Sequence, residues 1–133
     1  MSKPTTPSSQ GPSTVETLGA ALAGRRVLLL DPTHTLPDLL RGVQGVMLTI
    51  GRFGALDAGY LADSRPDAIL APLVGQDYDV LDLTRRLQEL GFKGALRAYC
   101  RPLPNTRLVR AEVAHIWPEL DFEIFEVPAL GAE

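Results

Sequence analysis

Short apolar segments alternate with amphipathic ones along most of this chain, and that alternation is the feature that most restricts its fold. Five segments have the apolar content and the flanking turn residues of strands. Between them, leucine and valine recur at the spacing of a helical face. The predicted strands are residues 25–31, 45–51, 66–74, 94–100 and 122–127, and the predicted helices are residues 15–23, 36–44, 55–64, 78–92 and 105–117. Strands that alternate with helices through short loops favour a parallel α/β sheet.

The apolar patterns of the strands indicate how the sheet is covered. Residues 27–30 are continuously apolar, which is typical of a parallel strand buried on both faces, whereas residues 122–127 alternate as an edge strand does. Right-handed crossovers would place helices on both faces of the sheet. A chain of 133 residues has the usual size of one domain. We therefore expect a doubly wound, flavodoxin-like sheet with the strand order 2-1-3-4-5.

A proline interrupts the third predicted strand, in the segment "ILAPLVG". Proline cannot donate a hydrogen bond to a strand ladder, so it argues against a central strand at that position. We expect Ile69–Ala71 to complete the buried strand and Pro72 to stand at its tip. The carboxyl ends of parallel strands are where α/β folds place their chemistry, so the identity of the residue at this tip bears on function.

Composition and charge argue against nucleic acid and membrane as partners and favour a reducing compartment. The net charge of −3 shows no basic excess for nucleic acid, and no apolar run is long enough to cross a membrane. The single cysteine, Cys100, can form neither an internal disulfide nor a cysteine zinc site, which fits a reducing cytoplasm. We expect a disordered tail rather than a signal peptide at residues 1–14, a helix at residues 15–24, and one domain at residues 25–133, with no cofactor.

From Arg25 to Pro128 the chain resembles the receiver domains of two-component response regulators. The clearest stretch is "RPDAILAPLVGQDYDVLDLTRRLQELGFKGALRAYC". In it, Pro-Asp precedes the third strand, an amphipathic helix of the form L-x-x-x-R-x-L follows, and a glycine turn leads into the fourth strand. The "VPAL" that follows the fifth strand is similar to the family's Lys-Pro. The resemblance implies a CheY-like fold and a role in bacterial signal transduction.

The resemblance also shows which groups of a receiver this chain lacks. Receivers use an acidic pair and Mg²⁺, an acceptor aspartate, a hydroxyl and a lysine to transfer and hold a phosphoryl group. Asp31 matches the first acidic position, but Pro32 replaces the second, Pro72 the acceptor, Tyr99 the hydroxyl and Val127 the lysine. Proline has no nucleophile and valine has no charge. We therefore expect a pseudo-receiver that is not an enzyme and that binds other proteins without being phosphorylated.

Two other functions stay open for the strand ends. Asp31, Asp77 or Asp79 could serve as an atypical phosphoacceptor, although an aspartate before a strong helical repeat, as at positions 77 and 79, more commonly caps that helix. Alternatively, the crevice at the strand tips could bind a small ligand, as flavodoxin-like folds often do. Fold alone does not distinguish these functions.

Basic and aromatic side chains around the fourth strand and the following helix suggest a docking surface. They are Arg97, Arg101, Arg107, Arg110 and Trp117. Arginine and tryptophan are enriched at interface hot spots, although a solvated basic face would have the same composition. The resemblance implies a signalling protein as partner, such as a kinase, a regulator or an output domain, or a second copy of the chain.

A receiver continues into a fifth helix where this chain has only "PALGAE" after its last predicted strand. The apolar sheet face under that helix would be larger than a monomer normally exposes. Val15, Leu18 and Leu22 lie on one face of the helix predicted at residues 15–23. We expect these three residues to pack against the uncovered face, within one chain or across a homodimer.

Overall fold

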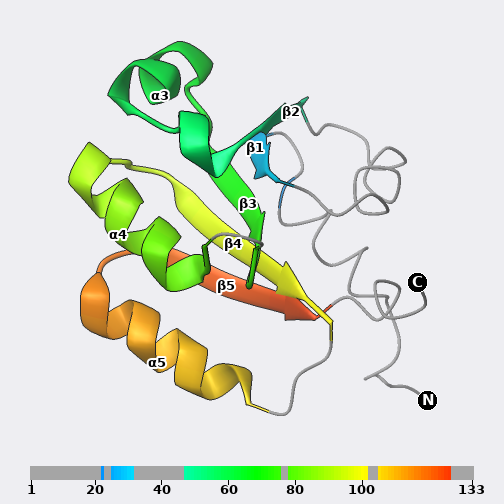
Figure 1. Ribbon diagram of the computed structural model, residues 1–133, viewed down its shortest axis with the longest axis vertical. Helices are drawn as coiled ribbons and strands as arrows, with labels where there is room; N and C mark the ends of the chain where they lie inside the picture. Colours follow the sequence, from blue (N-terminus) through cyan, green and yellow to red (C-terminus); the bar gives the residue numbers. More distant parts are fainter. Residues whose placement is uncertain (1–21, 23–24, 32–46, 76–77, 102–104, 127–133) are drawn as a thin grey trace, which may run out of the picture.

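The computed structural model describes residues 22, 25–31, 47–75, 78–101 and 105–126, which form a five-stranded sheet (Figure 1). The strand order is β2-β1-β3-β4-β5 and every neighbouring pair is parallel, which confirms the predicted flavodoxin-like arrangement. The strands are β1 (Arg26–Leu30), β2 (Met47–Gly51), β3 (Ala68–Pro72), β4 (Ala95–Cys100) and β5 (Asp121–Glu126). The helices are η2 (Phe53–Ala55), α3 (Ala58–Ser64), α4 (Val80–Leu90) and α5 (Thr106–Ile116). The helix predicted at residues 36–44 lies outside the described residues.

Pro72 is the last residue of β3, which confirms that it stands at the tip of the strand. It stands in register with Tyr99 of β4. The next residue, Leu73, donates its backbone N–H to the Tyr99 carbonyl at 2.8 Å. Because successive N–H groups of a strand point to opposite sides, the nitrogen of Pro72 faces β1, whose pairing with β3 ends at Leu70. The proline therefore removes no hydrogen bond from the ladder.

The helix ends follow local capping chemistry. Asp79 caps α4 by accepting from the Asp82 N–H at 3.0 Å, and the Asp82 carboxylate accepts from the Asp79 N–H in return. The predicted capping role of Asp79 is thus confirmed. The segment predicted as one helix at residues 55–64 divides into η2 and α3, because Asp57 accepts from the Tyr60 N–H and begins a new helix there.

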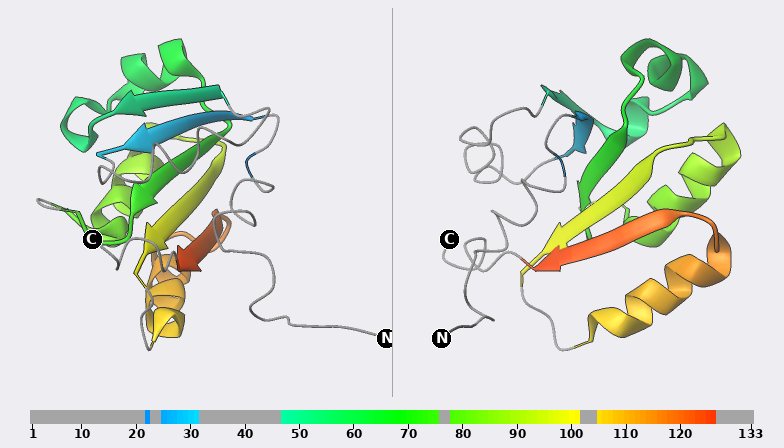
Figure 2. Two further views of the ribbon diagram at one scale, coloured as in Figure 1. Left: turned by 90° about the vertical axis from the view of Figure 1, so that its right-hand side faces the viewer. Right: turned by 180° about the vertical axis from the view of Figure 1, so that it is seen from behind.

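The two faces of the sheet carry separate apolar clusters. All three described α-helices lie on one side of the sheet (Figures 1 and 2), where the main cluster contains Leu28, Ile69 and Leu83. The opposite face carries a second cluster, consisting of Leu22, Val27, Leu29, Ala68, Leu70, Ala95 and Tyr99. Leu22, a helical residue, is fully buried there. It therefore packs on the face for which a cover was predicted, whereas Val15 and Leu18 lie outside the described residues.

The two edge strands differ in their surroundings. On β5, Arg110 of α5 donates to the Ile124 carbonyl at 3.4 Å and pairs with Glu123 at 2.9 Å. On β2, the apolar side chains of Met47 and Ile50 are 63% and 56% exposed. Charged side chains over a strand edge hinder pairing with another chain. One edge of the sheet is thus partly covered by an ion pair, and the other presents apolar side chains to solvent.

Candidate functional site

The structure brings the described members of the predicted pocket to one end of the sheet. Asp31 follows β1, Pro72 ends β3, and Tyr99 stands beside Pro72 on β4. Parallel strands place their carboxyl ends at the same edge, which explains this convergence. Pro32 and Val127, the other two predicted members, lie outside the described residues.

Asp31 is held in a specific conformation by the chain that follows β2. Its backbone is left-handed, with φ of 43°, and its N–H donates to the Gly51 carbonyl at 2.9 Å. Its Oδ2 atom accepts from the Phe53 N–H at 2.9 Å. The carboxylate therefore joins the tip of β1 to the start of η2. This bond uses one of the lone-pair sites of the carboxylate and fixes its orientation.

Tyr78 is a member of the site that the sequence pattern did not indicate. Its ring stacks on Phe53, with centroids 4.3 Å apart and an interplanar angle of 10°. Gly75 permits this arrangement, because a Cβ atom at Gly75 would lie 2.9 Å from Tyr78 Cε1. The close spacing of Gly75 and Tyr78 in "GQDYD" was a signal of a tight turn, but nothing in it pointed to Phe53.

The Tyr78 hydroxyl is buried beside two other polar groups. The side chain is only 8% exposed, and its hydroxyl lies close to the Asp31 carboxylate. Burial raises the pKa of the Tyr78 phenol, and the negative charge of Asp31, a hydrogen bond to its carboxylate and the proximity of Tyr99 raise it further. The strand ends are thus occupied by two buried tyrosines and one carboxylate, and the phenol of Tyr78 stays neutral at physiological pH.

Carboxylates available for metal or phosphoryl chemistry are sparse in the part of the chain that the structure describes. No group of three or more His, Cys, Asp or Glu side chains there could hold a metal ion. Asp79 is engaged in the cap of α4. Asp77 is not among the described residues. A single carboxylate with one oxygen already bonded is a weak Mg²⁺ site, since that ion demands near-octahedral oxygen ligation.

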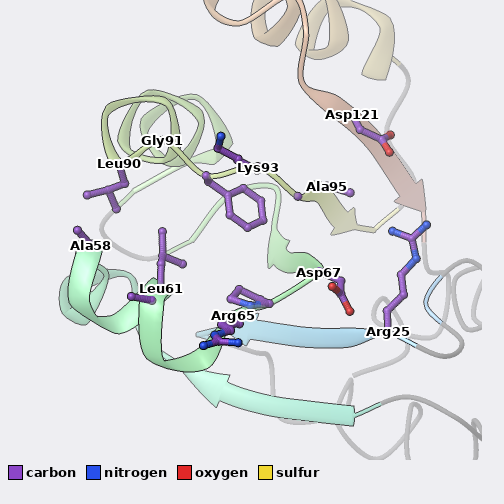
Figure 3. Close-up of a pocket in the computed structure, with 14 residues that line it drawn as sticks. Arg25, Ala58, Leu61, Arg65, Asp67, Leu90, Gly91, Lys93, Ala95 and Asp121 are labelled. Carbon is purple, nitrogen blue, oxygen red and sulfur yellow. The ribbon is translucent and has the colours of Figure 1, made fainter.

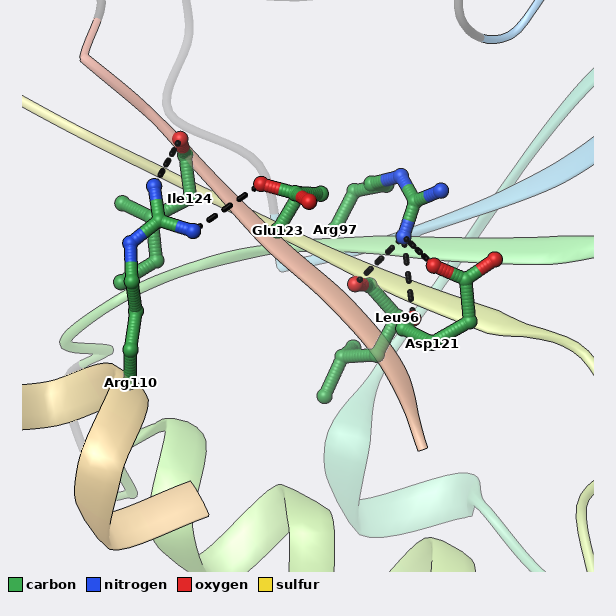
Figure 4. Close-up of polar contacts among 6 residues, drawn as sticks. All are labelled: Leu96, Arg97, Arg110, Asp121, Glu123 and Ile124. Atoms are coloured by element: carbon green, nitrogen blue, oxygen red, sulfur yellow. Dashed lines mark hydrogen bonds and ion pairs between the residues drawn. The ribbon is translucent and has the colours of Figure 1, made fainter. Parts of the chain in front are cut away.

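The predicted docking residues separate into two groups. Arg110 pairs with Glu123, and buried Arg97 donates to the Leu96 and Asp121 carbonyls and pairs with Asp121 Oδ1 at 3.0 Å (Figure 4). Trp117 is half-buried and packs against the main apolar cluster. Arg101 and Arg107 are exposed. Arg97 is therefore not part of an exposed basic surface, because its position in the sheet gives its guanidinium group partners within the domain. Arg110 stays exposed although it pairs with Glu123, so its docking role, like that of Arg101 and Arg107, stays a prediction.

Comparisons with known proteins add no relative: no family model matches the chain, and neither the curated proteins nor the solved structures contain a significant match. No helix of the described residues is long and apolar enough to span a membrane.

Proposed function

We propose that the chain is a receiver-like domain that binds other proteins without being phosphorylated. The observation that carries this proposal is Pro72 at the carboxyl end of β3, where a receiver would present its acceptor carboxylate. Proline offers no oxygen to a phosphoryl group. The carboxylate that follows β1, that of Asp31, accepts a hydrogen bond from the Phe53 N–H.

The aromatic filling of the strand ends supports the same proposal. A phosphoryl group and its metal ion need polar, solvated space, and two buried tyrosines with a stacked phenylalanine reduce that space. Preorganised positive charge normally stabilises phosphoryl transfer. The position that would supply a lysine carries Val127. The docking surface would then keep one conformation, or would change its conformation only when a partner binds.

The exposed first turns of α5 are the docking surface that we favour for this function. Leu108 is 62% exposed, Arg107 beside it is exposed, and only Val113 of α5 is fully buried. An apolar side chain next to an unpaired arginine is a common composition of an interface centre. The partner would be a signalling protein or a second copy of the chain.

Incubation with Mg²⁺ and a small phosphodonor should leave the intact mass of the protein unchanged. The physical reason is the absence of an available acceptor carboxylate at the end of β3. A receiver domain that retains its aspartate, treated in parallel, should gain about 80 Da, the mass of one phosphoryl group. An adduct on this chain would contradict the proposal, and Asp31→Asn and Asp79→Asn would then locate it.

A photo-crosslinking residue at position 108 should form a covalent product with a partner protein or a second copy. The same photo-crosslinking residue at position 85, on the solvent-facing side of α4, should form no such product, although both positions lie on helices and are open to solvent. Mass spectrometry of the crosslinked products is the measurement. Equal products from both positions would mean that α5 is not a specific docking surface.

A further inference from the structure

A cleft of about 740 Å³ lies at the opposite end of the sheet, where the strands begin (Figure 3). One wall comes from α3 and the other from the end of α4, and the starts of β3, β4 and β5 form its base. Its lining residues lie at the amino ends of the strands, whereas Asp31, Pro72 and Tyr99 lie at the carboxyl ends, so the two sites are separate. It is also separate from Leu108 on the first turns of α5.

Two abrupt helix ends create this cleft. Arg65 ends α3 in a left-handed conformation, with φ of 45°, and Gly91 ends α4 in the same region, with φ of 72°. Gly94 then brings the chain against the backbone of Asp67 so closely that no side chain fits there. The chain therefore enters β3 and β4 by short, tight connections, and the helix ends flank open space.

The lining of the cleft divides into an apolar half and a charged half. Figure 3 shows Ala58, Leu61 and Leu90 near one another on one side, while Arg25 and Asp67 lie on the other. The two leucines are half-buried, so each still presents apolar surface to a ligand. An occupant that matches both halves must therefore be amphipathic.

The charges of the cleft are not balanced internally. Asp67 Oδ2 accepts from the Arg26 N–H at 2.9 Å, and Asp121 Oδ1 pairs with Arg97 at 3.0 Å. Within the described part of the chain, the side chains of Arg25, Arg65 and Lys93, which also line the cleft, have no hydrogen bond or ion pair. Three cations thus line the cleft against two carboxylates, and Arg97 already neutralises the Asp121 carboxylate. The Asp67 carboxylate keeps its negative charge, because a backbone N–H does not neutralise it. The lining therefore carries an excess of positive charge, although the whole chain carries a net charge of −3.

We infer that this cleft binds an acidic segment of a partner protein, with an apolar side chain seated between Leu61 and Leu90 and carboxylates facing Arg65 and Lys93. A protein segment fits better than a small anion because the rim residues Arg65, Lys93 and Asp67 are exposed. A small ligand there would stay largely in water, whereas ligand pockets usually bury most of their ligand. A nucleic acid would make no use of the apolar half. This inference goes beyond the proposed function and does not depend on phosphorylation chemistry.

Fluorescence anisotropy with synthetic peptides tests the inference on the full chain. The probe is a short labelled peptide with leucines flanked by glutamates, and its controls replace either the glutamates with lysines or the leucines with serines. We expect only the original peptide to bind. The double variant Arg65→Glu/Lys93→Glu should weaken binding about tenfold or more, because attraction becomes repulsion at two exposed sites. The matched control is Arg85→Glu, an exposed cation on α4 that does not line the cleft.

Four results would overturn the inference. They are no binding of the acidic leucine peptide, equal binding of the serine control, equal or tighter binding of a single-stranded oligonucleotide, and equal weakening by Arg85→Glu. Thermal unfolding of each variant checks that the domain is folded, and the neutral double variant Arg65→Gln/Lys93→Gln, at two exposed positions, gives a second route if the charge reversal lowers stability. Crosslinking from position 108 is unaffected by any of these outcomes, so failure here and failure of the proposed function are distinguishable.

Discussion

The substitution Leu22→Ala is expected to lower the free energy of unfolding by about 2–5 kcal/mol, the usual cost of truncating a fully buried leucine. Leu22 is fully buried in the cluster that contains Val27, Leu70 and Tyr99, so alanine would leave a cavity on that face of the sheet. Denaturant unfolding followed by tryptophan fluorescence gives the measurement, with Trp117 as the only tryptophan.

Leu108→Ala provides the matched control for this experiment. Leu108 is 62% exposed, so its truncation should change the free energy of unfolding by less than about 0.5 kcal/mol. Equal effects at both positions would mean that Leu22 does not cover the sheet. Measuring the unfolding midpoint at several protein concentrations distinguishes packing of the N-terminal segment within one chain from packing across a homodimer. A midpoint that does not change with concentration indicates packing within one chain, and a midpoint that rises with concentration indicates a second copy.

The substitutions Tyr78→Phe and Tyr78→Ala are expected to lower stability by different amounts. Phenylalanine keeps the stack on Phe53 and loses only the contact of the hydroxyl with Asp31, so it should lower the free energy of unfolding by about 0.5–1.5 kcal/mol. Alanine also empties the space and should lower it by about 3–5 kcal/mol. Tyr60→Phe, at a half-buried tyrosine of α3, is the control and should change little. Equal losses from both Tyr78 variants would mean that the stack on Phe53 contributes little.

The raised pKa of Tyr78 also predicts that the stability of the wild-type protein depends on pH in a way that the stability of Tyr78→Phe does not. A group whose folded-state pKa lies above its unfolded value contributes stability at pH values below the unfolded pKa, about 10 for tyrosine. That contribution is lost as the pH rises further, because the unfolded state releases the proton first. Wild-type stability should therefore fall above about pH 10 more steeply than that of Tyr78→Phe. Parallel curves would mean that the phenol ionises equally in both states.

Much of the fold could be predicted because buried parallel strands and amphipathic helices have distinct periods. Residues 27–30 form a strand covered on both faces, and their continuous apolar run indicated this directly. The convergence of Asp31, Pro72 and Tyr99 was also predictable, because the strand order fixes which tips are neighbours. The stack of Tyr78 on Phe53 was not, because it depends on how two loops meet. The burial of Arg97 and the ion pair of Arg110 were not predictable either, because a sequence does not show which carbonyl or carboxylate a long side chain will reach.

The unequal edges of the sheet limit how copies of this domain could associate through their strands. Arg110 occupies the Ile124 carbonyl of β5, whereas Met47 and Ile50 of β2 face solvent. Strand pairing between two copies would then use β2 on both, across a twofold axis. Such a pairing closes on itself, because it leaves only the guarded β5 edges at the two ends. By this route two copies would pair as a closed dimer, and the ion pair of Arg110 with Glu123 would hinder the addition of a further copy at β5.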